Sequence, residues 1–170
     1  KGNGTLKIGQ EMWTYNPKVN RVIKLPPALM SQSWMGSDFS NNDLAKSDSI
    51  LNDYTHTLKG TETHDGHTVY VIESLPKANA PVVWGLQIIK IRDDHVIVSQ
   101  EFFDEDLASV KKMTAHEIQM MSGRSFPKVW KMQETNQPGQ FTQLTYEAIV
   151  FLDSLPDRTF TRNALTSSRR

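Results

Sequence analysis

The sequence lacks cysteine, long apolar runs and any excess of charge of one sign. Without cysteine, a disulfide framework and a thiolate nucleophile are excluded. No stretch approaches the roughly 20 consecutive apolar residues of a membrane span, so we expect a soluble chain that does not span a membrane. The 19 Lys and Arg residues match the 19 Asp and Glu residues, and we therefore expect no nucleic-acid partner.

Motifs of enzyme active sites are also missing. The sequence contains no G-x-S-x-G nucleophile elbow and no glycine-rich phosphate loop. The acidic run Asp104–Asp106 lies between two predicted strands, where such residues commonly form solvated turns. Ser37 and Asp38 have no histidine that the sequence places beside them. We predict that the protein is not an enzyme and needs no cofactor, with a hydrolase as the minor alternative.

One short motif offers metal ligands. His64-Asp65-Gly66-His67 contains two imidazoles and a carboxylate, but Asp65 and Gly66 are explained by the geometry of a hairpin turn. No further protein ligand is evident near the motif in the sequence. We therefore predict a solvated turn and no metal.

The sequence does contain a succession of β-prone runs separated by turn residues. The length of 170 residues suits one domain, and we expect a single domain over residues 1–170. The clearest hairpin pairs 54–63 with 67–75 around Asp65-Gly66, which supplies the positive φ of a tight turn. Further predicted strands cover residues 10–15, 21–25, 84–92, 96–103, 107–121, 125–135 and 140–152.

Two of these runs differ in their side-chain pattern. The run 140–152 alternates apolar and polar residues, which predicts a half-buried strand. Its apolar face carries Leu144, Tyr146, Ala148, Val150 and Leu152. The run 84–92 is apolar on both faces, which predicts a strand covered on both sides. Helices are expected to be short: 41–51, capped by Ser40, and 156–165.

The least strand-like segment is 28–40, which contains two methionines, a tryptophan and a phenylalanine around Gly36. Flexible thioethers and aromatic rings beside a glycine hinge are typical of an adaptable apolar surface. Two interpretations stay open. In the first, Trp34 and Phe39 are core residues that plug one end of the barrel. In the second, the segment is a flap that lines an apolar cavity.

Three motifs near the start of the sequence form a recognisable pattern. They are Trp13-Thr14-Tyr15-Asn16-Pro17, Asn20-Arg21-Val22, and Met35-Gly36-Ser37-Asp38-Phe39-Ser40 followed by Asp43-Leu44. This pattern resembles the signature of the outer-membrane lipoprotein-sorting family, whose members are LolA-like, and the order of the later hairpins is similar. The resemblance implies a mainly β fold, in which a curved antiparallel sheet forms an incomplete, half-open β-barrel with one or two short helices.

The resemblance also implies a location and a function. Members of the family are exported to the periplasm and enclose an apolar cavity for acyl chains. We therefore expect a periplasmic carrier of lipid or lipoprotein acyl chains, with a transporter of the resistance-nodulation-division (RND) type or an outer-membrane acceptor as a further partner. Such proteins usually have additional residues before this region, so we expect a domain that lacks its N-terminal part.

The flap and its neighbourhood supply the expected binding residues. Those predicted to contact an acyl chain are Trp13, Tyr15, Leu25, Leu29, Met30, Trp34, Met35, Phe39, Trp84 and Ile88. Arg21 and Asp38 are predicted to anchor the loop by pairing or by helix capping. In the alternative interpretation, Arg21 or Lys24 meets a lipid headgroup at the cavity mouth.

A competing hypothesis assigns the protein to another functional class. The chain would be an envelope protein–protein interaction module that docks through an open sheet edge and holds no lipid. A continuous apolar cavity favours the carrier, whereas a filled sheet interior favours the interaction module.

Overall fold

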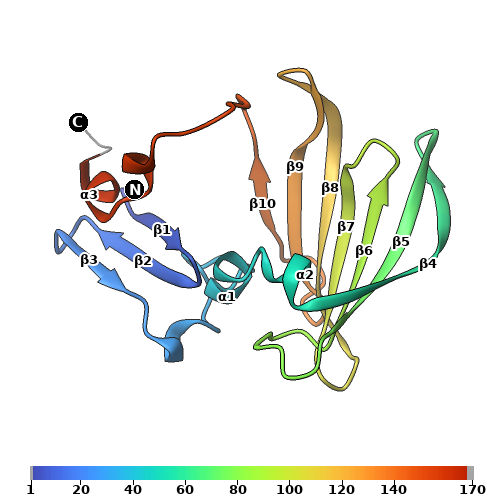
Figure 1. The fold of residues 1–170 in the computed structure, drawn as a ribbon, viewed down its shortest axis with the longest axis horizontal. Helices are drawn as coiled ribbons and strands as arrows, with labels where there is room; N and C mark the ends of the chain where they lie inside the picture. Colours follow the sequence, from blue (N-terminus) through green and yellow to red (C-terminus); the bar gives the residue numbers. More distant parts are fainter. Residues whose placement is uncertain (1, 168–170) are drawn as a thin grey trace. The chain divides into compact units, whose positions relative to one another are not determined.

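The computed structural model describes residues 2–167 and contains two compact units. The first unit consists of the residues up to Ser47 and those from Leu152 onward, and the second unit consists of Asp48–Phe151. Figure 1 labels the elements of both units. This division does not test the expected single domain over residues 1–170, which stays a prediction.

The first unit contains a three-stranded antiparallel sheet in the order β1-β2-β3. Its strands are β1 (Gly4–Ile8), β2 (Glu11–Asn16) and β3 (Arg21–Lys24). The turn between β2 and β3 is fastened by Tyr15, whose hydroxyl donates to Asn20 Oδ1 at 3.0 Å. Helix α3 (Arg162–Ser167) contacts all three strands. The predicted hairpin of 10–15 with 21–25 is therefore present.

The predicted helix 41–51 is divided into two short helices, α1 (Asn41–Ala45) and α2 (Ser49–Asn52). Ser40 caps α1 as predicted: its Oγ accepts from the Asp43 amide at 3.2 Å, and its own amide donates to the Asp43 carboxylate at 2.7 Å. The division follows from the backbone of Lys46, which leaves the helical region at φ −107° and ψ 22°.

The other helical segments are single turns. The 3₁₀ helix η1 (Pro27–Leu29) opens the loop before α1. The predicted helix 156–165 begins as a second 3₁₀ turn, η2 (Asp157–Phe160), and α3 follows only after Thr161, whose backbone is extended. Every helix in the described part of the chain falls short of the length and apolarity that crossing a bilayer requires.

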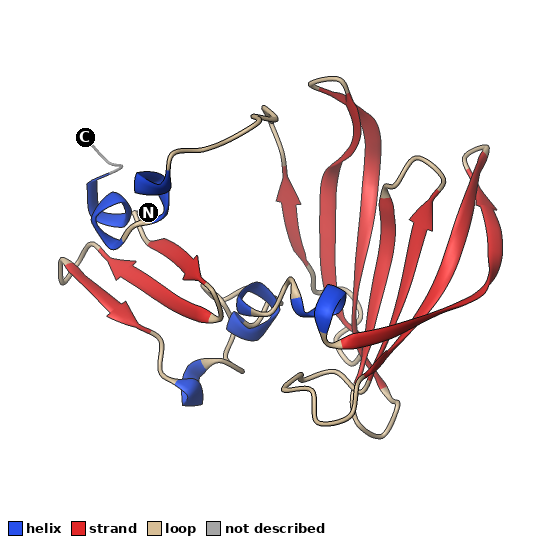
Figure 2. Ribbon diagram, viewed as in Figure 1, coloured by secondary structure: helices blue, strands red, loops and turns tan. Residues whose placement is uncertain are grey.

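The second unit is a seven-stranded antiparallel sheet in the order β10-β9-β8-β7-β6-β5-β4. Its strands are β4 (Tyr54–His64), β5 (His67–Pro76), β6 (Leu86–Arg92), β7 (Ile97–Phe103), β8 (Ser109–Met121), β9 (Arg124–Glu134) and β10 (Thr142–Thr145). Figure 2 shows that strands dominate this unit and that its sheet curls. Within residues 2–167, β4 and β10 are the edges of this sheet, so it is open. The predicted mainly β fold with an incomplete barrel is confirmed.

Tight turns set the register of this sheet. Asp65 and Gly66 have φ values of 49° and 77°, and Ser122 and Gly123 have 48° and 82°. Two consecutive positive φ angles define the turn type whose twist matches that of the flanking strands. The hairpin signal read from Asp65-Gly66 is confirmed.

The predicted strand 140–152 is too long. The strand β10 ends at Thr145, and the last backbone link to β9 is the bond from the Tyr146 amide to the Lys128 carbonyl at 2.8 Å. Beyond it, the chain follows the sheet through aromatic contacts, with Phe126 packing against Tyr146 and Phe151 at centroid distances of 5.2 and 6.0 Å. Of the predicted apolar face, only Leu144 and Tyr146 are half-buried, whereas Val150 and Leu152 are 71% and 62% exposed, so the alternating pattern predicted neither the end of the strand nor the burial beyond Tyr146.

Candidate functional site

The register divides the seven-stranded sheet into two faces of opposite character. Directly opposite residues on neighbouring strands point to the same side of a sheet. One row that crosses all seven strands is mostly apolar and consists of Leu58, Ile72, Ile89, Gln100, Met113, Met132 and Thr142. The adjacent row on the other side consists of Gly60, Val71, Lys90, Ser99, Thr114, Lys131 and Gln143. We call these sides the apolar face and the polar face.

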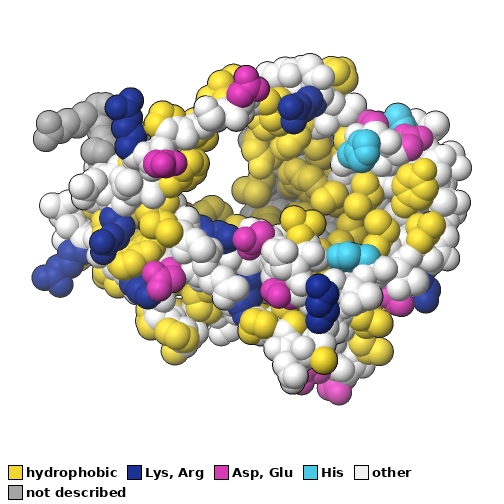
Figure 3. Space-filling model, in the orientation of Figure 1, with side chains coloured by type: hydrophobic (Ala, Val, Ile, Leu, Met, Phe, Trp, Pro, Cys, Tyr) yellow, Lys and Arg dark blue, Asp and Glu magenta, His cyan; other side chains and the backbone are white. Residues whose placement is uncertain are grey.

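The apolar face extends beyond this row. Tyr70 lies opposite Ile91, and a further row joins Ala115, Trp130 and Leu144. Figure 3 shows apolar side chains gathered over a hollow in the second unit. Met132 is only 1% exposed, whereas Leu58 is 59% exposed at the β4 edge. An apolar sheet face that reaches solvent is a candidate binding surface.

A groove of about 400 Å³ opens on the apolar face next to the β4 edge. Its lining residues all belong to the second unit: His56, Leu58, Tyr70, Ile72, Ile91, Arg92, Asp93 and His95. Half of these side chains, Leu58, Tyr70, Ile72 and Ile91, are aliphatic or aromatic, and polar groups lie beside them. This combination of an apolar wall and a few polar groups is typical of small-ligand pockets.

Trp84 covers the opposite end of the apolar face, near the β5–β6 connection. Its ring centre lies 5.3 Å from that of Phe102, and the Lys111 Nζ lies 4.9 Å from the Trp84 ring centre. The Tyr54 hydroxyl donates to the Trp84 carbonyl at 3.0 Å. Burial of this hydroxyl raises the pKa of Tyr54, against the opposing effect of its hydrogen bonds with Gln87 and Trp84. These contacts fix Trp84 in place.

The predicted acyl-chain residues are distributed between the two units. Eight of them, from Trp13 to Phe39, belong to the first unit, and two belong to the second. Trp84 lies over the apolar face, but Ile88 pairs with Glu73 and Glu101 and therefore lies on the polar face. The predicted set as a whole stays a prediction.

The segment 28–40 is a tightly bonded loop. Its ends approach through the bridge between Ser33 and Ser40, and the Trp34 amide donates to the Phe39 carbonyl at 2.6 Å. Trp34 Nε1 donates to Thr5 Oγ1 at 3.0 Å. Phe39 is buried, as the plug interpretation expects, whereas Met35 at the tip of the turn is 52% exposed. Of the remaining predicted members in the first unit, Tyr15 is buried, whereas Trp13, Leu25, Leu29 and Met30 are half-buried or exposed.

The predicted anchor residues Arg21, Lys24 and Asp38 belong to the first unit, and their anchoring or headgroup role stays a prediction. Arg21 is exposed opposite Asn16, at the beginning of β3. Lys24 forms an ion pair with Glu11. The cap of α1 is Ser40 rather than Asp38, because only Ser40 immediately precedes the helix and faces its free amides.

Sequence reasoning missed most of the apolar face. Ile72, Ile89, Met113, Met132 and Trp130 were not among the predicted binding residues. Their signal was present in principle, because they share one face once the positions of the hairpin turns fix the register.

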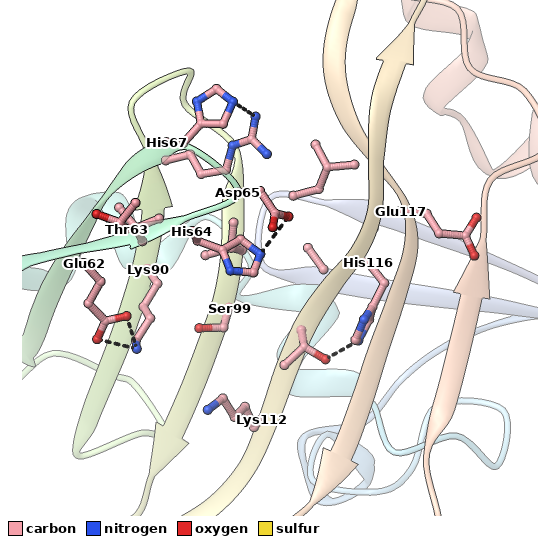
Figure 4. Close-up of a pocket in the computed structure, with 16 residues that line it drawn as sticks. Glu62, Thr63, His64, Asp65, His67, Lys90, Ser99, Lys112, His116 and Glu117 are labelled. Atoms are coloured by element: carbon pink, nitrogen blue, oxygen red, sulfur yellow. Dashed lines mark hydrogen bonds and ion pairs between the residues drawn. The ribbon is translucent and has the colours of Figure 1, made fainter.

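The polar face carries a second groove, of about 800 Å³, whose charged groups have partners. Lys90 pairs with Glu62 at 2.7 Å, and His64 with Asp65 at 3.3 Å. Figure 4 shows these pairs and the contact between His116 and Thr114. A groove whose charges are already compensated offers no strong electrostatic attraction to a ligand.

One cluster beside this groove has the composition of a metal site. Ligand atoms of His67, Asp93 and Asp94 lie within 4.8 Å of one another. However, Arg92 donates to His67 Nε2 and to the Asp94 carboxylate, each at 2.7 Å, and His67 Nδ1 contacts Asp93 at 2.6 Å. The guanidinium charge occupies this position and opposes a second cation. We interpret the cluster, which we call the Arg92 latch, as a hydrogen-bonded fastening of β5 to the β6–β7 turn.

The latch also changes the acidity of its carboxylates. The hydrogen bond from His67, followed by that from the Thr68 amide, lowers the pKa of Asp93. The hydrogen bonds from Arg92 lower the pKa of Asp94. Both carboxylates are thereby held in their charged form.

Solved structures share this architecture along nearly the whole chain. A DUF1329 family protein from Desulfovibrio piger matches with a TM-score of 0.83 at 24% identity, covering 97% of this chain and 71% of that chain. A putative outer membrane lipoprotein-sorting protein domain from Vibrio parahaemolyticus matches with a TM-score of 0.75 at 22% identity, covering 92% of this chain and 66% of that chain. A LolA superfamily protein from Nitrosomonas europaea matches with a TM-score of 0.71 at 22% identity, covering 96% of this chain and 72% of that chain. The fold is therefore LolA-like, which confirms the predicted resemblance.

The sequence itself matches one family model. The model describes its family as "Uncharacterized protein" and matches residues 1–167, so the chain belongs to that family. No curated protein matches the sequence.

Proposed function

We propose that the protein is a periplasmic carrier that binds the acyl chains of lipids or lipoproteins on its apolar face and catalyses no reaction. The observation that carries this proposal is the apolar row that crosses all seven strands while the adjacent row on the other face is polar. The likeness to a lipoprotein-sorting domain supports it. An RND-type transporter or an outer-membrane acceptor is the proposed partner in delivery.

The physical basis is the burial of methylene groups against the sheet. Each buried methylene contributes about 0.8 kcal/mol, so a sixteen-carbon chain gains on the order of 10 kcal/mol before its ordering cost is subtracted. Such binding needs few directed polar contacts. The apolar row, with a single amide at Gln100, fits this requirement.

A second candidate function, the protein–protein interaction module, is favoured by the open edge at β4. After Tyr54, every residue of β4 is exposed. However, the strand is interrupted by an irregularity between Leu58 and Gly60, where Lys59 is located. A bulge and a lysine are features that hinder pairing of an edge with another strand, so we favour the carrier.

The proposal is tested by native mass spectrometry and lipid extraction of protein purified from its own cells, followed by titration with a fluorescent fatty acid. The chain offers a matched pair of variants. Leu58 and Leu75 are 59% and 45% exposed and lie on the apolar and the polar face. We expect Leu58→Arg to weaken fatty-acid binding about tenfold or more, the equivalent of 1.4 kcal/mol.

Leu75→Arg is the control for Leu58→Arg. Leu75→Arg should bind as the wild type does, because the substitution lies on the other face. Absence of both copurified lipid and fatty-acid uptake would refute the carrier, and equal losses in the two variants would remove the apolar face as the site.

A further inference from the structure

A third groove, of about 580 Å³, opens beside the β8–β9 turn, and we call it the turn groove. Arg124, Phe126 and Phe151 are among its lining residues, all of which belong to the second unit. Arg124 and Phe126 each precede Trp130 in β9 by an even number of residues, so strand alternation places them on the apolar face with it. The turn groove therefore extends the apolar face at one end of the sheet.

The turn groove contains a guanidinium whose charge no described acid neutralises. Arg124 is exposed, and its Cζ lies 4.8 Å from the centre of the Phe151 ring. Phe126 packs edge-on against the same ring, with 6.0 Å between the ring centres. Within residues 2–167, the Phe151 ring is the partner of the Arg124 side chain, which forms no ion pair there. A ring attracts the guanidinium through its face and leaves the N–H groups able to donate.

The other charged group of the lining is already compensated. Asp94 lines the turn groove, but Arg92 donates to both of its carboxylate oxygens, at 3.0 and 2.7 Å. His95 is the remaining titratable residue of the lining. Because Arg92 neutralises Asp94, Arg124 gives the turn groove a net positive charge, which favours an anionic ligand.

The turn groove adjoins the apolar groove next to the β4 edge, which we call the β4-edge groove. His95 lines both of them, and the neighbouring residues Asp93 and Asp94 each line one. The two grooves therefore meet at the β6–β7 turn. An amphiphilic ligand that spans both would place its tail against the aliphatic wall of the β4-edge groove and its anionic head beside Arg124.

The volumes of the two grooves indicate the size of each part of such a ligand. A cavity of roughly 150 Å³ accommodates benzene, which corresponds to about 25 Å³ per carbon atom. On this scale the β4-edge groove, of about 400 Å³, holds about 16 carbon atoms, which is one acyl chain. A carboxylate would leave most of the turn groove empty, whereas a phosphoglycerol group, at about 250 Å³, occupies a large part of its 580 Å³.

We propose that the turn groove binds the phosphate of an anionic phospholipid through Arg124, while one acyl chain of the same lipid lies in the β4-edge groove. This inference rests on the proposed carrier function and names its ligand class. A guanidinium can donate two parallel hydrogen bonds to a phosphate, and such charge-assisted bonds are the strong ones. The headgroup, in addition to the apolar chain, then decides which lipids the protein carries.

The test compares two lipids with the same acyl chain on the full chain of the protein. Below their micelle-forming concentrations, 1-lauroyl-lysophosphatidylglycerol and 1-monolauroylglycerol compete with the uncharged apolar probe N-phenyl-1-naphthylamine, whose fluorescence reports binding. We expect the wild type to bind the phospholipid about tenfold or more tightly than the uncharged lipid. Arg124→Gln should reduce this preference to about twofold or less and leave binding of the uncharged lipid unchanged.

Lys131→Gln is the matched control for Arg124→Gln. Lys131 lies in the same strand, and its Nζ is 4.8 Å from the centre of the Phe141 ring. The control therefore also removes one positive charge and one cation–π contact, but on the polar face and outside the lining of every groove described above. It should keep the wild-type preference. Arg124→Lys, which keeps the charge without the planar pair of donors, should give an intermediate preference.

Different results separate this proposal from the carrier function. Equal binding of the two lipids by the wild type, or a preference that survives in Arg124→Gln, overturns the phosphate site while the carrier stands. An equal loss in Lys131→Gln also overturns it, because net charge alone would then explain the preference. If dodecanoic acid binds as tightly as the phospholipid, a carboxylate suffices and the phosphate site is wrong.

Two further outcomes complete the test. Inorganic phosphate at the same concentration should not displace the phospholipid; if it does, the site belongs to free phosphate and the lipid headgroup is overturned. If the probe and both lipids fail to bind, the carrier function fails and the phosphate site falls with it. The wild-type comparison requires no variant, so it decides the proposal even if Arg124→Gln does not fold.

Discussion

The Arg92 latch shows how individual residues decide the charge state of a turn. Arg92 is only 7% exposed, and it donates through Nε and Nη2 to the two oxygens of Asp94 at 3.0 and 2.7 Å. A planar guanidinium that meets a carboxylate with two hydrogen bonds fixes both position and orientation. The latch therefore joins neighbouring parts of the second unit through charge rather than through apolar packing.

The latch predicts a dependence of stability on pH. The pKa of Asp94 is lowered by Arg92, so the charged carboxylate favours the folded state. This contribution is fully present above the unfolded pKa of about 3.9 and is lost as the pH falls through the lower folded pKa. We expect Asp94→Asn to destabilise the protein at pH 7 by about 1–3 kcal/mol, and the difference from the wild type to shrink in strong acid.

Urea unfolding between pH 7 and pH 2 measures this difference. Asp106→Asn is the control, because Asp106 is exposed in the turn after β7 and accepts no described bond from Arg92. A gap between Asp94→Asn and the wild type that stays constant over the whole pH range would contradict the linkage.

Residue-level prediction from the sequence reached only part of the candidate site. Ile88 and Ile89 are adjacent and chemically alike, yet they point to opposite faces, because β6 alternates and its partners fix the register. Alternation along the run 84–92 places the two on opposite faces, but because both faces of the run are apolar it does not tell which of them belongs to the apolar face of the sheet. The face of Ile89 depends on its pairing with Ile72 and Gln100 on the neighbouring strands.

At the scale of elements, the hairpins were predictable because their turn signals are local. Asp65-Gly66 determines a turn whatever the rest of the chain does. The end of β10 was not predictable in this way, because it depends on where the Tyr146 amide meets Lys128 and on packing of Phe151 against Phe126. The division of the helix 41–51 likewise depends on the backbone of Lys46 rather than on composition.

The β4–β5 turn supplies a prediction for an element. Gly66 has a φ of 77°, a conformation that a β-branched residue adopts only with strain. We expect Gly66→Val to destabilise the protein by about 1–2 kcal/mol, measured by urea unfolding. Gly60→Ala is the control, because Gly60 has no positive φ and a methyl group there meets no atom within 4 Å. A larger loss in Gly60→Ala than in Gly66→Val would contradict this account.

At the scale of the whole molecule, the ligand should act on stability by mass action. A ligand that binds only the folded protein, at a concentration 100 times its dissociation constant, adds about 2.7 kcal/mol to the free energy of unfolding. The expected single domain predicts one calorimetric transition, which should move to higher temperature with dodecanoic acid. Scanning calorimetry with and without the acid checks both expectations.

Two other outcomes of this calorimetric measurement would contradict two different predictions. Two transitions, of which only one responds to the acid, would show that the units unfold separately and would contradict the single-domain prediction. If no transition moves when dodecanoic acid is added, binding to the folded state is contradicted. Decanedioic acid, which carries a second charged end, is the control ligand.

The path of the chain has a consequence for biosynthesis. The second unit is one continuous stretch, whereas the first is assembled from both ends of the described chain, since α3 packs against β1, β2 and β3. Ribosomes add roughly 5–20 residues per second, so the early strands wait for the last helix for several seconds. During that interval the consecutive hairpins of the second unit can already pair. Strands β1–β3 are therefore translated before the second unit but packed after it, and among the described residues these nascent strands are the part that a chaperone would have to protect.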